Sequence, residues 1–275
     1  MSGRSPGIFW RIVGNGLRLY LRSWQGKRSH LAVTLLVQVL LLGFLHLQMP
    51  VLFRQISAFA GDRAGAGLAA VFVILFTLMA GLHRSLEVLF NRADLPYLLS
   101  SPVPERTVIL TRLVDVLVTT SLATLFLMLP MLNCAVYLYG AHWLWGWPAW
   151  LTGVTAITSL ALLATVVTVN ALGARAARTI LQVLGVFVGT CAILAMQAPT
   201  WLRHLAGRHE HADTIRRFFR AFETPPLPQL VDAASGSPGW MLALAAAALA
   251  CVALALRVMR RAFLAGAQGA AEAGS

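Results

Sequence analysis

Long apolar stretches alternate along the chain with short polar segments. A helix needs about 20 mostly apolar residues to cross the hydrocarbon core of a bilayer. Six stretches approach or reach this length: residues 30–49, 67–83, 113–139, 149–172, 180–198 and 239–256. The pattern therefore predicts an all-α integral membrane protein with six transmembrane helices in a domain at 30–256.

The segment before the first apolar stretch, residues 1–29, has helical periodicity and two faces. Large apolar side chains recur every three or four residues, and arginines follow the same spacing on a separate stripe; the apolar set is Trp10, Val13, Leu17, Tyr20 and Trp24. A helix of this kind lies flat at the lipid headgroups. Two roles remain open: a basic anchor that fixes the topology, or an elbow helix that moves with the first span.

Composition supports a membrane protein. The 275 residues are 58% hydrophobic and 12% charged, whereas soluble domains carry about 25% charged residues. The net charge of +12 comes from short clusters between apolar runs, rather than from a basic face typical of nucleic-acid binding. Most arginines fall in the arm, around residues 84–112, at 175–178 and in the tail at 257–275. The positive-inside rule then places these segments and both termini in the cytoplasm.

The connection at 199–238 is the one long external segment that this topology predicts. Its amphipathic periodicity predicts short helices at the membrane surface, followed by a stiff turn at the prolines of residues 224–228. Packing on the membrane and a role as an outer gate are both open.

Few polar side chains interrupt the apolar stretches. Gln38, Asn133 and Asn170 are the candidates for a substrate path, since polar groups within a membrane are often functional. The alternative is that they join helices by hydrogen bonds. The GxxxG spacing of Gly185 and Gly189 favours close helix packing within the chain.

The sequence lacks the patterns of several kinds of chemistry. Cys134, Cys191 and Cys251 lie in apolar runs without CxxC spacing, and His209 and His211 do not have the spacing of a zinc site. The chain has neither a G-x-x-x-x-G-K-[ST] nor a G-x-S-x-G motif. We therefore expect no enzymatic activity, metal or cofactor in this chain.

Residues 94–106 form an unusually structured break between the second and third apolar stretches. The second helix is predicted to continue into the cytosol beyond His83, because Leu82 and Leu86 keep helical spacing. Asp94 can cap a short helix with Pro96 in its first turn, and Pro104 suits the first position of the next helix. We expect a stiff helix with an exposed apolar surface.

This segment resembles the cytoplasmic coupling segment of ABC-type exporter permeases, in particular the large bacterial putative exporters. The residues that match are Asp94, Leu95, Leu98, Leu99, Ser100, Pro102, Val103, Pro104 and Arg106, and Tyr97 adds to the apolar surface. The six stretches and the basic arm also match. The resemblance implies that these residues dock on a separate ABC ATPase, which would bind ATP and magnesium.

The resemblance implies a permease subunit of an ATP-driven exporter in the bacterial inner membrane. Larger relatives hold about twice as many spans, so a second permease half is expected, either another copy or a different chain. The tail at 257–275 suggests a flexible end or an interrupted linker. Two other functions remain open, a membrane scaffold or assembly factor without transport and a secondary carrier.

Overall fold

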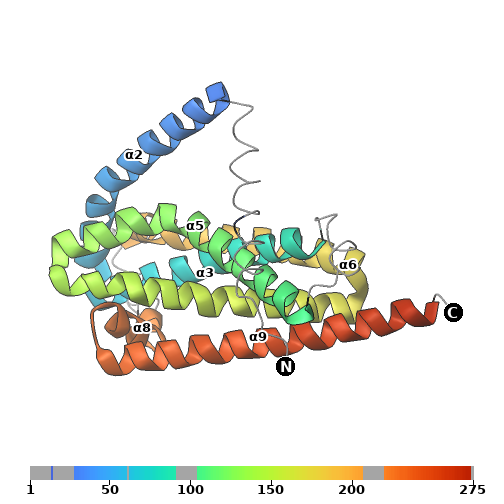
Figure 1. Ribbon diagram of the computed structural model, residues 1–275. Coiled ribbons are helices and arrows are strands. Elements are labelled where there is room, and N and C mark those ends of the chain that lie inside the picture. The colour runs from blue at the N-terminus through green and yellow to red at the C-terminus, as the bar shows by residue number, and fades with distance from the viewer. Residues whose placement is uncertain (1–13, 15–27, 61, 91–103, 207–219, 274–275) are drawn as a thin grey trace.

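The computed structural model describes residue 14 and residues 28–60, 62–90, 104–206 and 220–273, and this part of the chain is helical without strands. In chain order the helices are α2 (Arg28–Ala60), α3 (Asp62–Phe90), α5 (Glu105–Tyr139), η1 (Ala141–Trp145), α6 (Gly146–Ala206), η3 (Ala221–Glu223), α8 (Leu227–Ala234) and α9 (Pro238–Ala273). Most of the long helices lie together in a bundle, with α8 at one end (Figure 1). The all-α prediction is confirmed.

Helix α6 consists of two limbs that meet at Gly173, where φ is 79° and ψ is 161°. In a straight helix Ala161 and Leu181 would be roughly 30 Å apart. Both instead pack in one buried cluster with Leu82 of α3. The chain therefore reverses at Gly173, directly after the predicted end of the fourth span at residue 172.

Two apolar clusters hold the bundle together, one toward each end. The first joins the end of α3, the beginning of α5, the first limb of α6 and the second half of α9; its buried members are Val88, Ile109, Leu113, Val116, Leu162, Val166 and Met259. The second joins α2 to the start of α3 and the end of α5; its buried members are Met49, Met128, Met131 and Cys134. The order of these residues shows that α3 and α5 run antiparallel.

Between the clusters, α3 and α6 approach very closely at Gly81. A Cβ atom added there would lie 3.0 Å from the Cβ of Ala161 and 3.5 Å from the Cα of Thr158. Gly189, on the second limb, lies against Met79 of α3. Gly185, the other glycine of the GxxxG spacing, meets no heavy atom within 4 Å of an added Cβ, so of the two only Gly189 packs closely within the chain.

Helix α2 slants away from the other long helices (Figure 1). Val33, Leu40 and Leu47 are 61%, 64% and 75% exposed, although all are apolar. Contact with the bundle occurs near Met49, which is buried next to Pro50. A helix that is apolar on all sides and yet exposed suits a lipid environment.

Five helical stretches are long and apolar enough to cross a membrane: Leu36–Arg54, Arg63–Val88, Arg106–Tyr139, Ala141–Gly173 and Pro238–Arg261. They overlap five of the six predicted spans, as expected for a membrane protein. The remaining one, 180–198, lies in the second limb of α6 and is not among the five found in the described residues.

The segments between the spans are described only in part. Helix α3 continues past His83 to Phe90, as the apolar spacing predicts. Within the connection at 199–238, the described elements are the end of α6, η3 and α8. Most of the predicted arm at 1–29 lies outside the described residues.

Candidate functional site

One end of the bundle collects arginines from four elements. They are Arg84 on α3, Arg106 and Arg112 on α5, Arg175 and Arg178 after the α6 turn, and Arg257, Arg260 and Arg261 on α9. We call this the basic end. The described arginines near the opposite end, which we call the α8 end, are Arg54, Arg63, Arg203 and Arg220. This asymmetry agrees with the predicted distribution of positive charge.

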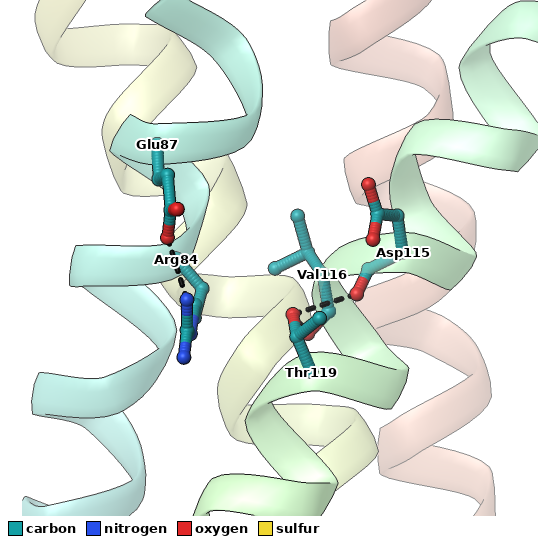
Figure 2. A network of polar contacts seen from close by, with 5 residues as sticks. All are labelled: Arg84, Glu87, Asp115, Val116 and Thr119. Carbon is teal, nitrogen blue, oxygen red and sulfur yellow. Dashed lines mark hydrogen bonds and ion pairs between the residues drawn. The ribbon is translucent and has the colours of Figure 1, made fainter. Parts of the chain in front are cut away.

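Figure 2 shows the polar contacts of α3 and α5 at the basic end. Arg84 donates a hydrogen bond from Nη1 to Oε2 of Glu87 at 2.6 Å, but the two side chains are 38% and 45% exposed, so the ion pair contributes little stability. On α5, the hydroxyl of Thr119 donates to the carbonyl oxygen of Asp115 at 2.7 Å. Arg112, in contrast, is only 5% exposed. The basic end thus contains both an exposed ion pair and a buried arginine.

The predicted coupling segment joins α3 to α5 at the basic end. Of the residues named for this role, the structure describes Pro104 and Arg106, and both are exposed. The carbonyl oxygen of Pro104 accepts a hydrogen bond from the amide of Thr107 at 2.8 Å, and Pro104 is the N-cap of α5. The helix therefore begins at Glu105, one residue later than predicted. The other residues named for this role lie outside the described residues: Asp94, Leu95, Tyr97, Leu98, Leu99, Ser100, Pro102 and Val103.

The three polar residues proposed for a substrate path do not form one site. Gln38 is exposed on α2, 11 residues before Met49, where α2 packs against the bundle. Asn133 lies next to the apolar cluster of the α8 end, whereas Asn170 lies beyond the cluster of the basic end. The structure therefore does not bring these three side chains together.

Asn133 joins two helices. Its Nδ2 atom lies 3.4 Å from Nε2 of His46 on α2, and Nδ1 of His46 lies 2.9 Å from the carbonyl oxygen of Leu42. If Nδ1 carries the proton and donates to Leu42, Nε2 is free to accept from Asn133. This contact agrees with the alternative of an interhelical hydrogen bond.

At the α8 end, a cavity of about 260 Å³ lies among α3, α5, α6 and α8. The pattern of apolar and polar residues does not predict this cavity. The sequence feature that accompanies the cavity is a stripe of small side chains at helical spacing on each of two helices. These are Ala66, Ala69, Ala70 and Val73 on α3 and Ala149, Gly153 and Ala156 on α6. Either stripe alone is also typical of close helix packing, so neither predicts a cavity. The cavity forms only because α3 and α6 diverge where these small residues lie.

The described residues contain no group of three or more His, Cys, Asp or Glu side chains that could hold a metal ion. The arrangement offers instead a basic end that carries a connecting segment and, at the other end, an apolar cavity. No protein-family model, curated protein or solved structure matches this chain.

Proposed function

We propose that this chain is the membrane-spanning permease subunit of an ATP-driven ABC exporter. In this proposal residues 94–106 dock on a separate ATPase in the cytoplasm, and ATP hydrolysis there drives substrate movement through the membrane. Tyr97, Leu98 and Leu99 provide the apolar docking surface, and Arg106 adds a positive charge at its edge.

The observation that carries the proposal is the antiparallel pair of α3 and α5. Val88 near the end of α3 packs in one buried cluster with Ile109 and Leu113 near the start of α5. The segment between the two helices is therefore held at both ends on the basic end. A displacement of this segment would act on two long helices at the same time.

These helices are long enough to transmit motion across the bundle. At 1.5 Å per residue, the 29 residues of α3 extend roughly 44 Å and the 35 residues of α5 roughly 52 Å. Thr77 of α3 and Met131 of α5 line the cavity of the α8 end. Motion imposed at the basic end would thus change the shape of that cavity.

The proposal includes a sixth span and a second permease half. The second limb of α6 contains residues 180–198 and runs back from the turn at Gly173 toward the α8 end. Counting it as a span places both termini on the side of the basic end. The distribution of arginines makes that side the cytoplasm of a bacterial inner membrane.

The test of the proposal is purification of the tagged chain from its native membrane in detergent. We expect a nucleotide-binding ATPase to copurify with the wild-type chain. Leu98→Asp or Leu99→Asp should remove the ATPase from the complex, because an aspartate in an apolar interface leaves a buried charge unpaired.

The matched control is Leu144→Asp, which makes the same change at an exposed leucine of η1 near the α8 end. This variant should keep the ATPase. Transport without an ATPase, driven by an ion gradient, would favour a secondary carrier. A stable complex that lacks an ATPase and does not transport substrate would favour a membrane scaffold.

A further inference from the structure

The cavity at the α8 end is large and almost wholly apolar. Its walls include Ala70, Val73, Met131, Gly153 and Leu230, and none of its lining residues carries a charge. Its volume of about 260 Å³ exceeds that of an apolar protein cavity of about 150 Å³, which is large enough to bind benzene. The cavity can therefore hold part of a hydrocarbon chain.

Two lining residues have buried polar atoms without a hydrogen-bond partner: Oγ1 of Thr77 and Nε1 of Trp150. Thr77 is only 1% exposed. Thr124 and Thr165, which are equally buried, donate to carbonyl oxygens of their own helices at 3.0 and 2.8 Å. Thr77 makes no such bond, and neither do the buried residues Thr120 and Thr158, which do not line the cavity.

Unpaired buried donors are uncommon, because each one loses its hydrogen bonds to water. An indole N–H can only donate, so its partner must be an acceptor, whereas a threonine hydroxyl can donate or accept. An acceptor oxygen on a ligand would satisfy Trp150 and can also serve Thr77. The absence of charge in the lining disfavours an ionised headgroup inside the cavity.

We infer that this cavity binds an uncharged acyl ester, with the hydrocarbon chain against its apolar walls and an ester oxygen accepting hydrogen bonds from Trp150 and Thr77. The ester can come from a bilayer lipid or from a separate amphiphile, because both present the same chemistry. This inference does not depend on an ATPase partner, so its test is independent of the proposed function.

The test uses the full chain purified in detergent and methyl laurate as the probe. Native mass spectrometry measures the bound fraction, with n-tetradecane as a hydrocarbon of the same chain length without oxygen. We expect one bound methyl laurate and markedly weaker binding of tetradecane. Thr77→Val and Trp150→Phe should each weaken methyl laurate binding by about fivefold, the effect of one neutral hydrogen bond, and leave tetradecane binding unchanged.

Gly153→Leu should abolish binding, because an added Cβ there meets no heavy atom within 4 Å and the leucine side chain can fill the cavity. The control is Gly185→Leu, which adds the same side chain to open space on the second limb of α6 and should bind the probe normally. Thermal unfolding of each ligand-free variant separates loss of binding from loss of folding.

Extraction of the purified wild-type chain distinguishes the two sources. A lipid ester that copurifies with the wild type and not with Gly153→Leu identifies the bilayer as the source. Binding of added methyl laurate without any copurified ester identifies a site for a separate amphiphile. Equal binding of methyl laurate and tetradecane, or normal binding by Gly153→Leu in a folded chain, would overturn the inference.

Discussion

A chain carrying Gly81→Leu is expected to lose roughly 3 kcal/mol of stability, toward the upper end of the effects of overpacking. Even an alanine Cβ at this position would lie 3.0 Å from the Cβ of Ala161, an atom that cannot move without its backbone. The leucine would push α3 away from the first limb of α6, where Ala161 shares a buried cluster with Leu82. Unfolding in mixed micelles with increasing SDS measures the loss.

Three further variants separate overpacking from a general effect of leucine. Gly43→Leu adds the same side chain on α2, where an added Cβ meets no heavy atom within 4 Å, and should leave stability nearly unchanged. Gly81→Ala should be destabilising alone and recover when combined with Ala161→Gly, because the second change moves the small residue across the contact. Equal stability of Gly81→Leu and Gly43→Leu would contradict the close approach of α3 and α6.

Replacing Gly173 by alanine is expected to destabilise the reversal in α6 by roughly 1–3 kcal/mol, because a φ of 79° with a ψ of 161° belongs to a region that glycine alone adopts readily. Gly185→Ala is the matched control. It makes the same substitution within the second limb, where helix propensity favours alanine by up to about 1 kcal/mol. The two variants should therefore shift the unfolding midpoint in opposite directions. A Gly173→Ala chain as stable as the control would show that the chain does not reverse at this residue.

Several features of the fold follow from local sequence patterns. The fourth apolar stretch ends at Leu172, and the break occurs at the next residue, Gly173. The apolar spacing of Leu82 and Leu86 predicts that the second helix continues past His83, and both leucines are buried. Such features depend on one segment at a time, which is why the sequence is sufficient to predict them.

Other features depend on how several helices meet, and a single segment does not reveal them. An apolar residue such as Leu47 suits lipid as well as a protein core, so the pattern does not predict that α2 slants away from the bundle. The location of Trp150 near the start of α6 is typical of a tryptophan at the membrane interface, yet its side chain also lines the cavity. Its unpaired Nε1 atom becomes evident only when α3, α5 and α6 are placed together.

The central claim, that residues 94–106 contact an ATPase in the cytoplasm, is tested most directly by site-specific photocrosslinking in intact cells. The crosslinking amino acid benzoylphenylalanine replaces Leu99 in one strain and, as a control at the α8 end, Leu144 in another. We predict a light-dependent adduct with a nucleotide-binding ATPase from position 99 and none from position 144. An adduct of position 99 with a protein exposed outside the cell, or an ATPase adduct from position 144 instead, would contradict the account.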